Sequence, residues 1–245
     1  GKEGFETTSN AGTNRKWFHG ELARWDTFAQ DVLAFYRDKR MVEELSRCKD
    51  LPIGPDSAIR QLNKYAATEE VIMNGGETTL SGRFFQNALV PVISSVHTMA
   101  SKEYGSISNP PWLPSSLTFG DSWIIDKRDR AGGLQPDIVL KLRTDDEHKV
   151  RMVGELKFCV TVDLEDMAKY AINGDGSQFD AILGQIIQYM LTYRVKYGFL
   201  SNYTSTVMIL LENFTDAAGN AAPCIYFSDV IKNTDCVDEE ETKIS

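Results

Sequence analysis

Apolar residues recur every three or four positions in two long stretches of the chain, a spacing that predicts amphipathic helices. The clearer stretch covers residues 177–197, and the other covers 80–98, where Pro91 is expected to kink the helix. The apolar positions of the first stretch are Phe179, Ile182, Leu183, Ile186, Ile187, Met190 and Leu191. Because these positions form one continuous stripe, this helix must pack against a sheet or another helix.

Between and after these helices the hydrophobic pattern becomes that of β-strands. The expected strands cover residues 122–126, 137–143, 149–159, 207–211 and 224–227. The second and third of them are joined by the polar turn 144–148, so they predict an antiparallel hairpin. A leading helix, three strands, a helix and two strands indicate an α/β fold with a mixed central sheet flanked by helices.

The N-terminal third follows a helical period from Trp17 to about Cys48, and a shorter helix is expected at 56–65. A Ser/Pro/Gly-rich loop is expected at 105–120. We therefore expect a polar leader at 1–16, a helical accessory layer at 17–76, a core at 77–232 and an acidic tail at 233–245. The accessory layer is interpreted as an extension of the core and as a candidate contact for a protein partner.

The 245 residues contain 26 basic and 35 acidic side chains, a net charge of −9, which argues against a general nucleic-acid coat but not against a local basic face. No apolar run approaches the roughly 18 residues of a membrane helix, so no membrane association is expected. The four cysteines lack the Cys-x-x-Cys spacing of common zinc sites. Reduced thiols in an intracellular protein, nuclear or cytoplasmic, are the preferred interpretation.

Acidic and basic residues gather on the predicted hairpin. Alternate side chains of a strand share a face, so Glu155 and Lys157 should lie on one side and Leu156 on the other. Pro136 suits the first position of the preceding strand, and the hairpin is expected to bring Asp137 beside Glu155. Two adjacent carboxylates form a hard-oxygen site that suits Mg²⁺.

Pro136-Asp137, followed after seventeen residues by Glu155-Leu156-Lys157, resembles the signature of the PD-(D/E)XK nuclease superfamily, the restriction-endonuclease-like phosphodiesterases. Gln185 and Tyr189 lie four apart on the next helix and are similar to the Gln-x-x-x-Tyr motif of the RecB-like branch. The stretch 185–212 also resembles nuclease-like regions of fungal protein-kinase-like proteins and of Crinkler-type effectors. The resemblance covers about 77–230 and implies a restriction-endonuclease-like sandwich with an N-terminal helical extension.

The resemblance also implies a role for each residue of the motif. Asp137 and Glu155 would hold Mg²⁺ or Mn²⁺, and Lys157 would stabilise and orient the attacking water. Gln185 would position Lys157 or the substrate backbone, and Tyr189 would support Gln185. A further metal-binding acid is expected from the helix before the sheet.

Glu77 is the candidate for this further acid, and Glu69, Glu70 and Glu103 compete with it. The implied function is divalent-metal-dependent hydrolysis of phosphodiester bonds in nucleic acid, with DNA as the preferred substrate. The alternative is a catalytically inactive nuclease-like module that binds a protein or nucleic-acid partner.

Each of these residues also has an ordinary structural interpretation when it is taken alone. Asp137 suits a turn, Glu155 with Lys157 suits a surface ion pair, and Gln185 with Tyr189 suits the boundary of a packed helix. Residues 127–151 carry seven bases and five acids, which is compatible with a substrate face or with solvated strand edges. The aromatic residues Tyr104, Trp112 and Trp123 are candidates for base stacking or for core and loop anchors.

Overall fold

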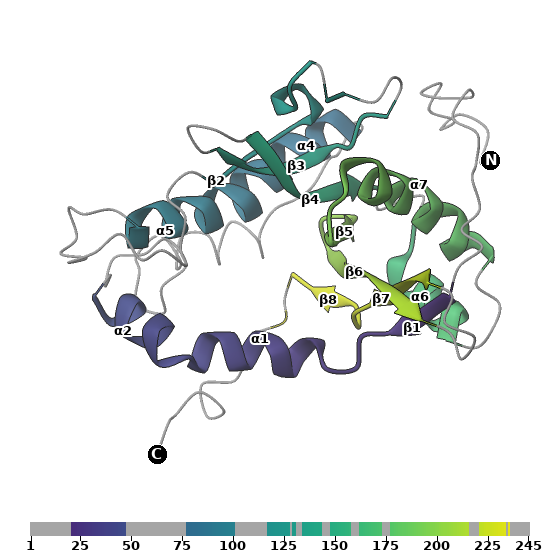
Figure 1. Cartoon of the computed structure of the whole chain (residues 1–245), viewed down its shortest axis with the longest axis horizontal. Helices are drawn as coiled ribbons and strands as arrows, with labels where there is room; N and C mark the ends of the chain where they lie inside the picture. Colours follow the sequence, from purple (N-terminus) through teal and green to yellow (C-terminus); the bar gives the residue numbers. More distant parts are fainter. Residues whose placement is uncertain are drawn as a thin grey trace.

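The computed structural model describes residues 21–47, 77–100, 117–127, 129–130, 134–143, 148–157, 162–172, 177–215, 221–233 and 235. Within these ranges one mixed, open sheet of eight strands is flanked by helices (Figure 1). The strands are β1 (Glu21–Arg24), β2 (Leu117–Gly120), β3 (Ile138–Arg143), β4 (His148–Leu156), β5 (Tyr197–Ser201), β6 (Ser205–Thr215), β7 (Ala221–Phe227) and β8 (Ile231–Lys232). Their order is β1-β7-β6-β5-β4-β3-β2, with β8 paired to β6. The expected mixed α/β architecture is therefore confirmed.

The described ranges also contain eight helical elements. They are α1 (Phe28–Arg37), α2 (Lys39–Arg47), α4 (Glu77–Phe84), the π-helical turn η1 (Phe85–Leu89), α5 (Val90–Ala100), the 3-10 turn η3 (Ser122–Ile124), α6 (Leu164–Ile172) and α7 (Ser177–Tyr193). No helix within the described ranges is long and apolar enough to cross a bilayer.

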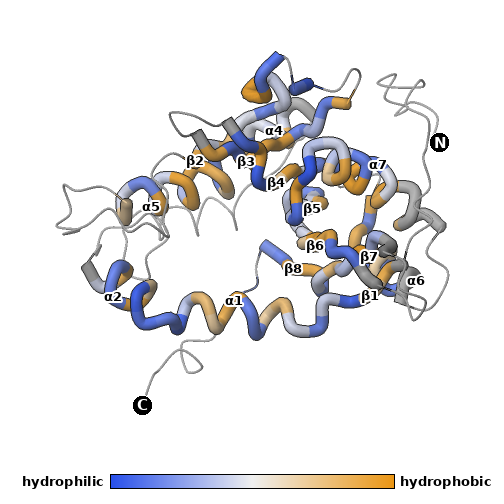
Figure 2. Tube along the Cα trace, viewed as in Figure 1, coloured by the Kyte–Doolittle hydropathy of each residue, from blue (hydrophilic) through white to orange (hydrophobic). Residues whose placement is uncertain are grey.

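The two faces of the sheet carry separate hydrophobic clusters. On β4, Val153 packs with the cluster of α6 and α7, whereas Leu156 packs with the cluster of α4. On β5, Leu200 belongs to the α7 cluster and Phe199 to the α4 cluster. In Figure 2 hydrophobic positions recur along the strands and along α7. The alternation along each strand thus places α6 and α7 on one face and α4 on the other.

The predicted hairpin forms between β3 and β4, which pair antiparallel with Ile138 opposite Gly154. Strand β4 pairs on its other side with β5, and this pairing is parallel. Since a parallel pair needs a crossover connection, α6 and α7 provide it between β4 and β5. Helix α7 is consequently held against the strand that carries the Glu155-Leu156-Lys157 motif.

The end of α7 differs from the expectation of a helix to residue 197. The helix ends at Tyr193 because Arg194 adopts a left-handed conformation with φ of 52°. The N–H of Arg194 donates to Leu191 O at 3.3 Å and that of Val195 donates to Met190 O at 2.9 Å, the two bonds of a Schellman motif. The residues that follow form β5, a strand that the hydrophobic pattern did not reveal.

The strand expected at 122–126 is also wrong. Residues Ser122–Ile124 form the 3-10 turn η3, which is capped by Asp121: its Oδ1 accepts from the N–H of Trp123 at 2.9 Å. The strand lies just before this turn, as β2, inside the segment expected to be a loop. A local side-chain cap thus replaced the extended conformation.

The segment expected to be helical from residue 17 to 48 begins, within its described part, with the strand β1. This strand adds to the edge of the sheet by parallel pairing with β7, and α1 and α2 follow it. Four residues are too few for a period-2 pattern to stand out from the helical spacing around them. The expected helix at 56–65 and the candidates Glu69, Glu70, Glu103, Tyr104 and Trp112 lie outside the described residues.

The interruption expected at Pro91 is present as η1, the π-helical turn between α4 and α5. Its closing bond runs from the N–H of Val90 to Phe85 O, five residues back. Pro91 has no N–H to donate, and its ring crowds the preceding turn, so a locally wider turn relieves the conflict.

Candidate functional site

Asp137 lies at the entrance to β3, and its side chain is bonded to the neighbouring strand. The register that pairs Ile138 with Gly154 places Asp137 opposite Glu155 at the next step. The Oδ2 of Asp137 accepts a hydrogen bond from the backbone N–H of Leu156 at 2.8 Å. The hairpin therefore brings the two acids side by side, as the sequence predicts.

Glu155 and Lys157 share one face of the strand end and bond to each other. The Nζ of Lys157 lies 2.7 Å from Oε1 of Glu155, and the two side chains are 19% and 6% exposed. The backbone N–H of Lys157 donates to Ser201 O at 2.8 Å, which extends the pairing of β4 with β5. Lys157 is thus fixed at its backbone and at its ammonium group while its side chain keeps some access to solvent.

Helix α7 adds two polar side chains to these strand residues. Gln185 Oε1 accepts a hydrogen bond from Lys157 Nζ at 2.9 Å, and Gln185 Nε2 donates to the hydroxyl of Tyr189 at 2.9 Å. The amide oxygen faces the cation and the amide nitrogen faces the phenol, so the orientation of the amide follows from its partners. Tyr189 is buried, so these bonds lie at the boundary between the hydrophobic core and the sheet end.

The surroundings of Tyr189 show that both acids lie close to it. Burial, and next the negative charge of Glu155, raise the pKa of the Tyr189 phenol above its ordinary value, and Asp137 acts in the same direction; the hydrogen bond with Gln185 acts in the opposite one. Tyr189 is therefore neutral at physiological pH and acts as a hydrogen-bonding group. We call Asp137, Glu155, Lys157, Gln185 and Tyr189 together the candidate site.

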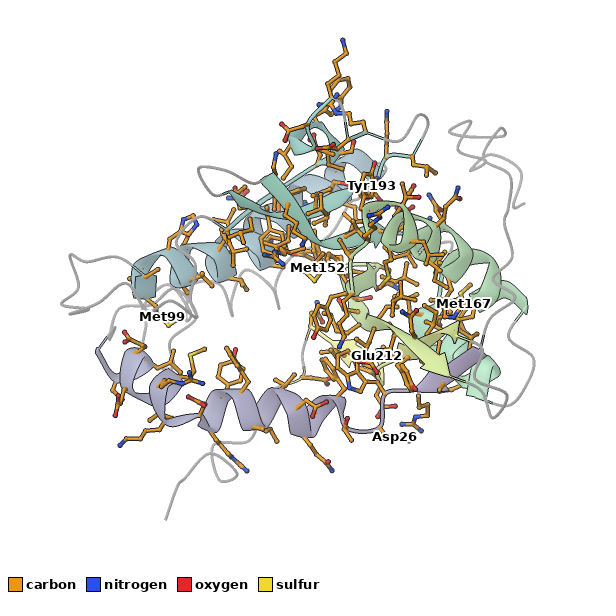
Figure 3. The ribbon with its side chains drawn as sticks, in the orientation of Figure 1. Asp26, Met99, Met152, Met167, Tyr193 and Glu212 are labelled. Carbon is orange, nitrogen blue, oxygen red and sulfur yellow. The ribbon has the colours of Figure 1, made fainter. Side chains whose placement is uncertain are left out.

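Tyr193 extends the candidate site in a way that the sequence reasoning missed. Its hydroxyl donates to Leu134 O at 3.0 Å, which ties the end of α7 to the segment leading into β3 (Figure 3). This bond positions the chain just before Asp137. The available signal was the spacing of four residues from Gln185 to Tyr189 and from Tyr189 to Tyr193, which puts all three on one flank of the helix.

The donor set of the candidate site fits a hard divalent cation. Asp137 and Glu155 provide two carboxylates, and Mg²⁺ is commonly bound by one or two carboxylates together with water and phosphate oxygens. Within the described residues no group of three or more His, Cys, Asp or Glu side chains could hold a metal ion. Helix α4 begins at Glu77, three residues before the start expected from the sequence, and the Glu77 side chain lies outside the described part of the structure.

Two of the seven bases of residues 127–151, Arg130 and Lys141, donate hydrogen bonds to backbone carbonyls within the protein. Lys141 is only 6% exposed, and its Nζ donates to Ile124 O at 2.7 Å. The guanidinium of Arg130 donates to Ile125 O and to Trp123 O at 2.9 and 2.6 Å. Both cations hold the η3 turn in place, whereas Lys149 and Arg151 are exposed on β4.

No protein-family model, no curated protein and no solved structure matches the chain.

Proposed function

We propose that the protein hydrolyses phosphodiester bonds of nucleic acid at the candidate site with a divalent metal ion, as the resemblance to the PD-(D/E)XK nucleases implies. The observation that carries this proposal is the continuous hydrogen-bond chain from Glu155 through Lys157 and Gln185 to Tyr189, with Asp137 at the entrance to the adjacent strand. The five residues come from three separate parts of the sequence. Their convergence on one sheet end favours a joint role over five unrelated structural ones.

Asp137 and Glu155 are the residues that would hold Mg²⁺ or Mn²⁺. When bound, the ion would supply positive charge to the scissile phosphate and lower the pKa of an attacking water. Hydrolysis forms a bond from the water oxygen to phosphorus and breaks the bond from phosphorus to the leaving sugar oxygen, which gains a proton. The protein must therefore orient the water and stabilise the negative charge that develops on the reacting oxygens.

In this proposal Lys157 does both. An ammonium group has three N–H donors, and Glu155 and Gln185 accept two of them in the structure. The remaining donor direction can serve a water or a phosphate oxygen. Because the ammonium is already held by two acceptors, little reorganisation is needed when substrate binds.

Gln185 and Tyr189 act as positioning residues in this proposal. Tyr189 accepts from Nε2 of Gln185, which turns Oε1 of the amide toward Lys157. Since Tyr189 stays protonated, its hydroxyl adds no charge to the two carboxylates nearby. The pair therefore sets the position of Lys157 without competing with it for the anionic substrate.

The test is cleavage of plasmid, single-stranded DNA and RNA with Mg²⁺ or Mn²⁺ by the wild type and by single variants. Lys157→Ala is expected to lose turnover but to keep metal binding in a calorimetric titration, whereas Glu155→Ala and Asp137→Ala lose both. The matched controls are Lys196→Ala and Glu212→Ala, which break a partly exposed lysine–glutamate pair of 2.7 Å between the residue before β5 and strand β6. These controls are expected to cleave and bind metal like the wild type.

The same experiment distinguishes the proposed nuclease from the alternative of an inactive module. Cleavage that is equal in the wild type, Lys157→Ala and Glu155→Ala would come from a contaminant. Absence of cleavage together with metal-independent binding of nucleic acid would support the inactive nuclease-like module.

A further inference from the structure

Trp123, in the η3 turn between β2 and β3, is exposed to an unusual degree. It is 68% exposed, the largest exposed fraction among the large hydrophobic residues of the described ranges. An indole is usually placed in a core or at an interface because it carries a large apolar surface. A single exposed apolar residue is common on protein surfaces. An exposed ring indicates a binding site only where the fold also holds the ring in place.

The backbone of Trp123 is held at both of its polar atoms. Its N–H donates to Oδ1 of Asp121 at 2.9 Å, and its carbonyl accepts from Nη2 of Arg130 at 2.6 Å. The next carbonyl, of Ile124, accepts from the buried Nζ of Lys141 at 2.7 Å. A buried lysine and an arginine thus fix the turn that presents the ring, and an exposed ring on a fixed turn loses little entropy when it binds a partner.

Arg130 also stacks on the ring. Its guanidinium carbon lies 4.5 Å from the centroid of the indole. With one ring face covered in this way and most of the residue exposed, the opposite face of the indole is open to solvent. An open aromatic face backed by a cation is a surface on which a planar π-system stacks.

The platform formed by Trp123 and Arg130 is connected to the candidate site through β3. Lys141, which holds the turn, lies on β3 four residues after Asp137 at the entrance to that strand, a separation of about 13 Å at about 3.3 Å per residue. We propose that this platform binds an unpaired nucleobase of a single-stranded nucleic acid. The choice of a nucleobase rests on the proposed function, whereas the platform itself rests on the contacts above.

The charge of the platform predicts how its binding depends on salt. Residues 121–130, which include the turn, carry three acids and three bases and therefore no net charge. Phosphate contacts make affinity fall with salt, whereas stacking does not release counterions. The contribution of Trp123 should therefore change little between low and high salt.

The experiment measures binding, not cleavage, of a fluorescent oligothymidylate in buffer with EDTA, by anisotropy. An oligomer of the same length with abasic sugars carries the same phosphates without bases. Trp123→Ala is expected to weaken binding of the oligothymidylate by about 5- to 150-fold and to leave binding of the abasic oligomer unchanged. Trp123→Phe, which keeps an aromatic ring, should restore part of the loss.

Phe35→Ala serves as the control, since Phe35 is an aromatic residue of α1 with 51% exposure, and Figure 1 shows α1 apart from β2 and β3. It is expected to bind both oligomers like the wild type. Equal affinity of the wild type and Trp123→Ala for the oligothymidylate would overturn the inference, as would equal weakening for the abasic oligomer.

The outcome is separable from that of the proposed function. Binding that depends on Trp123 in a protein that does not cleave would support the platform and refute catalysis. Metal-dependent cleavage in a protein whose strand binding ignores Trp123 would refute the platform alone.

Discussion

The ammonium of Lys157 lies 2.9 Å from the amide oxygen of Gln185, which links the end of β4 to the middle of α7. The two residues are 28 positions apart in the sequence. Their contact depends on the packing of α7 against β4. It joins the motif on the strand and the motif on the helix into one site.

Removal of this contact should impair turnover more than folding. Gln185→Ala deletes one of the two acceptors of the Lys157 ammonium, and hydrogen bonds to charged groups contribute about 1.5–3 kcal/mol. We expect the turnover rate to fall about ten- to hundredfold while the protein stays folded, with a melting temperature lowered by about 3–12 °C. The control is Gln188→Ala, which removes a glutamine of similar burial three residues further along α7. An equal loss of activity in both variants would refute the positioning role.

Tyr189 predicts a dependence of stability on alkaline pH. Burial and the nearby Glu155 raise the pKa of its phenol, so the folded protein keeps a proton that the unfolded chain loses above its ordinary pKa of 10. The unfolded state then binds fewer protons, and the free energy of unfolding falls as pH rises through and beyond 10. Below pH 9 this contribution is fully present and does not change with pH.

Tyr189→Phe removes this ionisation and also the acceptor of the Gln185 amide. Near pH 8 the variant should be less stable than the wild type by about 1 kcal/mol. Between pH 10 and 11.5 its free energy of unfolding should fall less steeply than that of the wild type, as measured by urea denaturation at each pH. Parallel curves over that range would show that Tyr189 does not have a raised pKa.

Gly154 is required by a close approach within the sheet. A Cβ at this position would lie 2.2 Å from Cζ of Phe199, whose ring is buried and stacked on Phe84 at 5.7 Å. Gly154→Ala should therefore destabilise the protein by about 1–3 kcal/mol through overpacking, and it should reduce activity because Glu155 is the next residue.

Gly82 in α4 provides the matched control for this substitution. A Cβ there would meet nothing within 4 Å, so Gly82→Ala is expected to stabilise the helix by about 0.5–1 kcal/mol. Chemical denaturation of both variants checks the prediction, and a stable Gly154→Ala protein would contradict it.

Lys141 is expected to be a structural cation. Its Nζ donates to Ile124 O at 2.7 Å and lies 3.4 Å from Oδ2 of Asp126. Lys141→Met keeps most of the side-chain volume but leaves that carbonyl without its donor, a loss of about 1–3 kcal/mol. Lys149→Met, at an exposed position of β4, should change the free energy of unfolding by no more than about 0.5 kcal/mol, and equal effects would place Lys141 among the surface bases.

The sequence by itself determined those features that depend on local spacing. The apolar stripe of α7 and the alternation along β4 are periodic, so they predicted a packed helix and the shared face of Glu155 and Lys157. The polar turn between β3 and β4 predicted the hairpin, and the hairpin is sufficient to bring Asp137 beside Glu155.

Tertiary structure alone decided the features that join distant segments or end an element without a local signal. Helix α7 ends at Tyr193, and the left-handed residue that follows it is Arg194, not a glycine, because Val195 and Met190 are both buried in the core and the Schellman bonds close around them. Strand β1 exists because the edge of β7 offers unpaired backbone groups.

The same division applies to individual side chains. Lys141 and Lys149 are both lysines of the hairpin in the sequence, yet one is buried against the η3 turn and the other is exposed. Tyr193 reaches Leu134 O, a carbonyl 59 positions away, only because α7 packs over the entrance to β3. Residue types and periodicity set which groups are available, and the packing of helix on sheet decides which of them meet.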